Sequence, residues 1–79
     1  MESKRFLGPA ARAIRKRTGI TRSAMADALQ CTPRWVSRIE SGQAQPSEEL
    51  AARYAARLRV SLDTLLAPVP HDQGMRGAA

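Results

Sequence analysis

Arg34, Ser37 and Arg38 bring three hydrogen-bonding side chains together within one short segment. On a helix, residues three or four apart are neighbours, so Arg34 and Arg38 share a face and Ser37 lies beside them. A guanidinium presents a fork of N–H donors that matches the two major-groove acceptors of guanine. A hydroxyl can donate to a base or to a phosphate. The spacing therefore indicates recognition chemistry, in which a helix reads a groove of DNA.

The segment around these donors has the signals of a short helix. Thr32 has the hydroxyl that caps a free backbone N–H at a helix start, and Pro33 fits the first turn, where no donor is needed. Gly42 supplies the left-handed residue that ends a helix. Val36 and Ile39 are three residues apart, so they form a buried face opposite the donors.

The charge of the chain lies mainly in its first half. The 79 residues include 13 Lys and Arg against 7 Asp and Glu, a formal net charge of +6, and this length fits one domain. Residues 3–38 carry nine basic side chains and one acidic one, whereas residues 39–79 carry four basic and five acidic ones. A basic half beside a near-neutral half indicates an anionic partner on one face. The alternative is an arginine-rich surface that contacts only solvent.

The sequence gives little support for a disulfide, a metal site or a catalytic site. The single cysteine, Cys31, excludes an internal disulfide and a cysteine-based zinc site, and the single histidine, His71, lies in a C-terminal segment without a catalytic partner. We therefore expect a protein that is not an enzyme and has no metal, cofactor or small-molecule ligand. No apolar run is long enough to span a membrane, and the first residues lack the apolar core of a signal peptide. We expect a cytoplasmic, nucleoid-associated protein without membrane contact.

Apolar residues at helical spacing, together with cap signals, predict an all-α fold with five helices and no strand. Gly19 has the residue type that ends a helix, and Thr21 and Ser47 have the hydroxyls that begin one. The predicted helices cover about residues 9–17, 22–29, 33–40, 48–58 and 62–66. They form one domain over residues 1–66. Residues 67–79 show no period, and we expect a disordered tail there.

Several segments share their residues and spacing with a known family. They are Thr18-Gly19-Ile20-Thr21, Ala24-Met25-Ala26, Thr32 followed by Val36-Ser37-Arg38-Ile39-Glu40-Ser41-Gly42, Pro46-Ser47, and Val60-Ser61-Leu62-Asp63 with Leu65-Leu66. Together they resemble the Cro/cI-type (XRE-type, lambda-repressor-like) helix-turn-helix domain over about residues 7–66. The resemblance implies a compact five-helix, lambda-repressor-like bundle, usually dimeric, in DNA-binding transcription regulators of bacteria and phages.

Two positions depart from the family pattern. Arg22 begins the second helix where the family often has glutamine, and an arginine there is a stronger, charge-assisted phosphate donor. Gln30 stands in the turn where the family has glycine, and a glutamine in a left-handed conformation carries strain. The first departure strengthens a phosphate contact, and the second affects the geometry of the turn.

We expect a sequence-specific transcriptional regulator, acting as a repressor, that reads the major groove of double-stranded DNA with residues 33–40. The expected base contacts are Pro33, Arg34, Ser37 and Arg38, and the expected backbone contacts are Arg15, Arg17, Thr21, Arg22, Thr32, Trp35 and Gln43. Arg12 and Lys16 are further phosphate candidates, with a solvent-exposed role as their alternative. Glu40 or a phosphate is an alternative partner for Arg38, and half-buried packing is an alternative role for Trp35.

The DNA site is expected to be a palindromic operator bound by a symmetric homodimer. One recognition helix covers only a few base pairs, and a dimer doubles the readout with half-sites about 10 base pairs apart. The expected dimer interface lies in the near-neutral half and comprises Leu62, Leu65, Leu66 and Val69. The alternative is that Leu62 and Leu65 close the core of the domain, which leaves Leu66 alone for pairing on DNA.

Two other functions stay open. One is an antitoxin or protein-interaction module whose DNA binding is autoregulatory, but such a protein needs a longer partner-binding segment than residues 67–79. The other is a general binder of RNA or membrane surfaces, which has no use for a capped helix that carries arginines on one face. The sequence specifies neither the operator nor the regulated genes.

Overall fold

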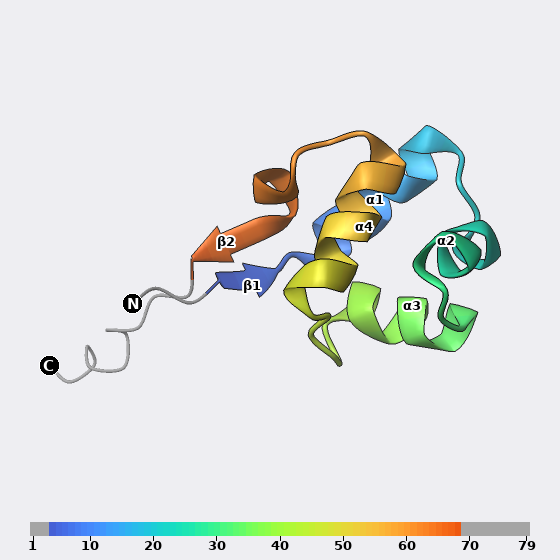
Figure 1. The fold of residues 1–79 in the computed structure, drawn as a ribbon, viewed down its shortest axis with the longest axis horizontal. Helices are drawn as coiled ribbons and strands as arrows, with labels where there is room; N and C mark the ends of the chain where they lie inside the picture. Colours follow the sequence, from blue (N-terminus) through green and yellow to red (C-terminus); the bar gives the residue numbers. More distant parts are fainter. Residues whose placement is uncertain (1–3, 69–79) are drawn as a thin grey trace, which may run out of the picture.

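The computed structural model describes residues 4–68, which form a helical bundle with a small sheet at one end (Figure 1). The elements in chain order are β1 (Lys4–Phe6), α1 (Gly8–Thr18), α2 (Arg22–Leu29), α3 (Pro33–Ser41), α4 (Glu48–Leu58), the 3-10 helix η1 (Leu62–Leu65) and β2 (Leu66–Pro68). The two strands are antiparallel, with Lys4 opposite Pro68 and Phe6 opposite Leu66. The sheet therefore joins the two ends of the described chain, at the end of the molecule away from α2.

The prediction of five helices and no strand is wrong in two respects within residues 4–68. The fifth segment is a four-residue 3-10 helix that ends early, because the backbone is already extended at Leu66 (φ −123°, ψ 149°), and the Ser61 side chain makes no capping hydrogen bond. Ala67 and Pro68, which we expected in the tail, belong to β2. Strands of three residues are too short to show periodicity. These two strands also lie at opposite ends of the described sequence, so no local signal predicts that they pair. The rest of the predicted tail, residues 69–79, lies outside the described part.

The five caps predicted for α1 to α4 are confirmed. The hydroxyls of Thr21, Thr32 and Ser47 each accept a hydrogen bond from the backbone N–H three residues on, at 3.0–3.1 Å. Gly19 and Gly42 end α1 and α3 in the left-handed conformation, with φ 83° and 87°. These caps set the limits of the helices, so the helix-turn-helix lies where the sequence predicts it.

The turn between α2 and α3 keeps a left-handed residue although that residue is not glycine. Gln30 has φ 58°, and its N–H donates to the Asp27 carbonyl at 3.1 Å. The Cys31 N–H donates to the Ala26 carbonyl at 2.9 Å. These bonds satisfy the last carbonyls of α2 and stabilise the turn, which offsets the strain of a side chain at positive φ.

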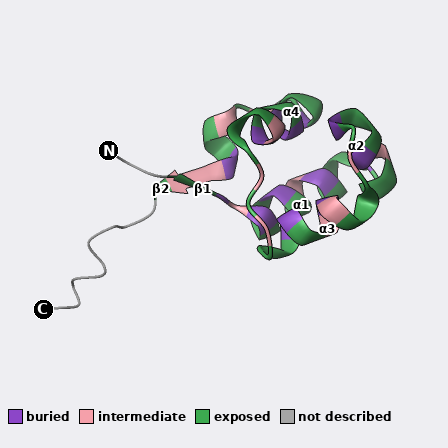
Figure 2. Ribbon diagram, turned by 60° about the horizontal axis from the view of Figure 1, so that its bottom comes forward, coloured by how far each residue is buried: buried purple, intermediate pink, exposed green. Residues whose placement is uncertain are grey.

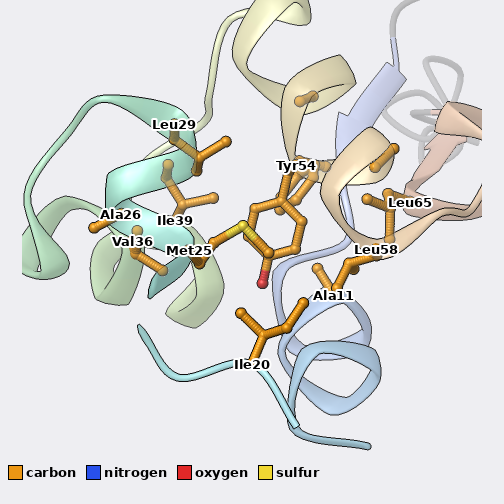
Figure 3. Packing of buried hydrophobic residues seen from close by; sticks show 13 residues of the cluster. Ala11, Ile20, Met25, Ala26, Leu29, Val36, Ile39, Tyr54, Leu58 and Leu65 are labelled. Carbon is orange, nitrogen blue, oxygen red and sulfur yellow. The ribbon is translucent and has the colours of Figure 1, made fainter. Parts of the chain in front are cut away.

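The buried apolar side chains form one cluster between the elements. Its members are Phe6, Ala11, Ile20, Met25, Ala26, Leu29, Val36, Ile39, Ala51, Tyr54, Ala55, Leu58 and Leu65. Figure 2 shows the buried residues on the inward sides of the helices, and Figure 3 shows the Tyr54 ring surrounded by labelled side chains of the cluster. Tyr54 also meets the Phe6 ring edge-on at a centroid distance of 5.4 Å. Through this cluster, β1 and all four α-helices share one core.

The first turn of α1 lies directly against the end of α3. A Cβ atom at Gly8 would collide with the carbonyl oxygens of Ile39 and Glu40. Only a residue without a side chain allows the two backbones this close approach. Gly8 is therefore a steric requirement for the position of α3.

Candidate nucleic-acid interface

α3 lies at the surface with one side inward and one side outward. Val36 and Ile39 are only 0% and 1% exposed, as the sequence predicts for its buried face. Arg34 and Arg38 are exposed, and Ser37 is half-buried. α3 therefore exposes the guanidinium groups of Arg34 and Arg38, while its inner side is fixed in the core.

A buried ion pair holds α3 against α1. Arg15 donates from Nε to Glu40 Oε2 at 2.7 Å and from Nη2 to Glu40 Oε1 at 3.1 Å. Its Nη1 donates to the Ile20 carbonyl at 2.7 Å. The Tyr54 hydroxyl on α4 donates to Glu40 Oε2. Three helices therefore meet at the carboxylate of Glu40, and this contact sets the orientation of α3.

The same contacts shift the pKa of the two donors. The hydrogen bond to Glu40 raises the pKa of Arg15, so the guanidinium stays charged. Burial raises the pKa of Tyr54 well above its ordinary value, and the hydrogen bond to Glu40 raises it further. The buried cluster therefore combines a charged guanidinium with a neutral phenol.

Arg15 is not the surface residue that we expected. Its side chain is 5% exposed and its guanidinium is bonded within the protein, so it cannot reach a DNA phosphate and the predicted backbone contact is wrong. A signal was present in the sequence. Arg15 follows Ala11 by four residues and Glu40 follows Val36 by four, which places opposite charges on the apolar faces of two helices. Such a pattern indicates an internal ion pair. Because the Glu40 carboxylate is bonded to Arg15, it does not hold Arg38.

A basic groove runs beside α3. It has a volume of about 450 Å³ and is lined by Pro9, Arg12, Ala13 and Lys16 of α1, Arg22 of α2, and Ser37, Glu40 and Ser41 of α3. The one acidic lining residue is Glu40, whose carboxylate is occupied by Arg15 and Tyr54. The groove therefore presents three cations and two hydroxyls, a combination that suits phosphate oxygens.

The other residues predicted for the interface lie around α3. Arg17, Thr21, Arg22, Thr32, Pro33 and Gln43 are exposed. Gln43 also closes the end of α3, because its N–H donates to the Arg38 carbonyl at 2.9 Å. Trp35 is half-buried and packs against the core cluster, and its ring centroid lies 5.7 Å from Cζ of Arg38.

The leucines predicted for a dimer interface are not equivalent. Leu65 is 0% exposed and belongs to the core cluster, so it cannot contact a second copy and that part of the prediction is wrong. Leu62 and Leu66 are half-buried. They line a second hollow of about 370 Å³ between the sheet, η1 and the start of α4. Val69 lies outside the described residues.

Between Lys4 and Pro68, no group of three or more His, Cys, Asp or Glu side chains is arranged to hold a metal ion. In the same part of the chain, no helix combines the length and the apolar character needed to cross a membrane.

The chain was compared with known proteins once this geometry was established. A family model described as a helix-turn-helix domain matches residues 7–68. This range contains all four α-helices and every residue that lines the basic groove, and it confirms the resemblance seen in the sequence. A comparison with curated protein sequences found no match.

Two solved structures of the clp gene regulator ClgR from Corynebacterium glutamicum are similar to this chain. The first has a TM-score of 0.71 and 33% sequence identity over 73% of this chain. The second has a TM-score of 0.70 and 33% identity, again over 73% of this chain and 74% of its own. The match spans 62% of the first ClgR chain, so it relates the domain described here to part of a longer protein.

Proposed function

Because the chain belongs to the helix-turn-helix domain family, we propose that it is a sequence-specific regulator of transcription that binds duplex DNA with α3 in the major groove. The observation that carries this proposal is the outward display of Arg34 and Arg38 from a helix whose inner side is anchored by Glu40. In helix-turn-helix proteins the second helix of the motif enters the major groove, and residues near its N-terminus contact base edges. The function is therefore binding, not catalysis.

Arg34 is the leading candidate for base readout. It lies in the first turn of α3, is exposed and has no ion-pair partner within residues 4–68. A bidentate arginine contact to guanine is the commonest specific contact in the major groove. Pro33, Ser37 and Arg38 complete the base-contacting set, with Pro33 able to meet a thymine methyl group.

The backbone contacts are proposed to lie on both sides of the helix-turn-helix. The groove formed by Arg12, Lys16 and Arg22 takes phosphates beside α1, and its cations replace Arg15 in this role. The remaining backbone-contacting residues are Arg17, Thr21, Thr32, Trp35 and Gln43. These contacts supply affinity and fix the register of α3 without reading sequence.

Repression is the effect that we propose. A protein that occupies its operator excludes other proteins from the same stretch of DNA, and this needs no further activity. The ClgR structures are those of a gene regulator, which supports a regulatory role of bacterial type for this chain.

A symmetric homodimer on a palindromic operator is proposed because one recognition helix covers only a few base pairs. Two copies place two α3 helices one helical turn apart, about 34–36 Å, on one face of the duplex. Leu62 and Leu66 line the hollow of the near-neutral half and are only half-buried, so a second copy would bury them further. The hydrogen bond from Phe6 N–H to Gln45 Oε1 (2.9 Å) closes part of the β1 edge, and Pro68 removes a donor from β2. The contact is therefore proposed to use side chains, not added strands.

The experiment that tests the function is selection of bound sequences from random duplex DNA, followed by titration of the protein with the selected site and with random DNA. We expect enrichment of one palindromic sequence and much tighter binding to it than to random DNA. Equal affinity for both duplexes would overturn the proposal.

A further inference from the structure

Arg34 and Arg38 are both exposed on α3, but they differ in what surrounds their guanidinium groups. Cζ of Arg38 lies 5.7 Å from the ring centroid of Trp35, within the distance at which a cation is attracted to the face of an indole. None of the ion pairs within residues 4–68 involves either arginine. The indole is therefore the group that holds Arg38, and Arg34 has no equivalent among the residues that the structure describes.

Trp35 is itself held in place. Its side chain is half-buried and packs against the core cluster, and its backbone N–H donates the cap bond to Thr32 Oγ1 at 3.1 Å. Residues 35 and 38 are three apart, so their side chains meet on one side of the helix. Glu40, the carboxylate that could have competed for Arg38, is bonded to Arg15 and Tyr54. The orientation of Arg38 thus depends on a ring that the core supports.

An arginine loses considerable rotamer freedom when it binds a base, and a side chain that is already oriented loses less. Arg38 gains this advantage from the indole, whereas Arg34 must be ordered by the DNA. We propose that Trp35 is a positioning residue that determines specificity: its indole orients the Arg38 guanidinium, so α3 reads DNA with one pre-oriented and one free arginine. This inference rests on the proposed function and assigns a distinct specificity role to Trp35.

The test compares two pairs of residues on the same helix. Affinity for the selected duplex is measured for Trp35→Leu, Arg38→Ala and the double variant, and then for the matched cycle with Arg34→Ala in place of Arg38→Ala. Leucine keeps an apolar side chain against the core and removes the aromatic face. We expect Trp35 and Arg38 to be coupled by about 2- to 5-fold in affinity, the range of an exposed cation–π contact. Trp35 and Arg34 are expected to be uncoupled.

The base preference gives a second readout that a packing role would not change. Trp35→Leu should reduce discrimination at the base pair whose preference Arg38→Ala abolishes, and should leave discrimination unchanged at the base pair read by Arg34. Trp35→Phe keeps a ring and should retain most of the coupling. If Trp35→Leu does not fold, which circular dichroism would reveal, the fluorescence of the wild type and of Arg38→Ala tests the contact instead.

A third readout needs no DNA. Trp35 is the only tryptophan of the chain, so the tryptophan fluorescence comes from this ring alone. Arg38→Ala should change the emission of the free protein, and Arg34→Ala should leave it unchanged.

The outcomes separate the inference from the function on which it rests. If the wild-type protein prefers a selected duplex but the Trp35 and Arg38 effects simply add, the positioning role is wrong and the DNA-binding function stands. Equal loss of affinity for selected and random DNA in Trp35→Leu, with the base preference that depends on Arg38 unchanged, would also overturn the positioning role, because Trp35 would then act only through its proposed backbone contact. If the wild-type protein prefers no duplex, the proposed function fails and the inference fails with it.

Discussion

Arg15 of α1 and Glu40 of α3 form a bidentate ion pair, with Nε–Oε2 at 2.7 Å and Nη2–Oε1 at 3.1 Å, and the two residues are 5% and 2% exposed. The pair lies directly beneath the helix that displays Arg34 and Arg38. The buried ion pair thus fixes the orientation of the helix whose exposed side carries the two arginines. The proposed readout depends on this buried contact although neither partner is proposed to contact the DNA.

Removing one partner of the pair is expected to be costly. Glu40→Ala leaves the Arg15 guanidinium buried without its carboxylate, and such a loss costs about 3–5 kcal/mol of unfolding free energy. Urea unfolding measures it. The control is Glu49→Ala, which breaks the exposed ion pair with Arg53 (2.8 Å) and should cost at most about 1 kcal/mol.

Replacing both partners distinguishes a buried charge from a general packing defect. Arg15→Met combined with Glu40→Leu removes both charges and keeps apolar volume, so it should be more stable than Glu40→Ala. A double variant that is no more stable than Glu40→Ala, or a Glu40→Ala loss as small as that of Glu49→Ala, would show that the pair does not hold α3.

The raised pKa of Tyr54 predicts a loss of stability at alkaline pH. The folded protein holds the phenol proton more tightly than the unfolded chain, in which the tyrosine pKa is about 10. The stabilisation is therefore complete below about pH 10 and falls by up to about 1.4 kcal/mol per pH unit above it. Urea unfolding between pH 8 and pH 11.5 should show this fall in the wild type.

Tyr54→Phe provides the control for the alkaline transition. It lacks the titrating group, so its unfolding free energy should depend less steeply on pH over the same range. Tyr54 is the only tyrosine of the chain, so tyrosinate absorbance near 295 nm reports on it directly. Ionisation of the folded wild type near pH 10 would contradict the buried hydrogen bond.

The basic groove predicts a specific salt dependence. Arg12→Ala, Lys16→Ala and Arg22→Ala should each weaken binding to selected and random DNA alike, because phosphates carry no sequence information. Each should also reduce the slope of log affinity against log salt by about 0.9. Arg57→Ala on α4 removes an exposed arginine that does not line the groove and serves as the control. A groove variant with an unchanged slope would exclude its side chain from the DNA backbone.

The half-buried side chains of Leu62 and Leu66 provide a test of the proposed dimer. Leu66→Glu should abolish cooperative binding to a palindromic site while circular dichroism still reports a folded protein. Leu65→Ala is the matched core variant, and it should cost about 2–5 kcal/mol of stability because Leu65 is fully buried. A monomer by sedimentation at high concentration, with one protein per DNA site and no cooperativity, would exclude the dimer.

The helix-turn-helix could be predicted because its signals are local. Thr21 and Thr32 cap their helices, Gly42 ends α3, and Val36 and Ile39 face the core. Each of these features follows from neighbouring residues along the chain, where capping and periodicity act. Local signals therefore located the motif and its exposed arginines.

The features that were missed depend on contacts between distant segments. Arg15 was expected among the surface cations, although its partner Glu40 lies 25 residues further along the chain. The pairing of Phe6 with Leu66 joins two strands that are too short to show a period. The burial of Leu65, which the sequence offered only as the alternative to a dimer contact, depends on the turn of η1 back onto the core. Such contacts arise only when the whole domain is packed.

Arg34→Ala tests most directly whether α3 reads DNA sequence. Affinities of the wild type and the variant are measured for the selected site, for its single base-pair variants and for random duplex. We predict that Arg34→Ala costs about 1–3 kcal/mol on the selected site, relaxes the preference at one base pair and weakens binding to random DNA much less. Equal losses on the selected site and on random DNA, with every base preference intact, would contradict sequence reading by α3.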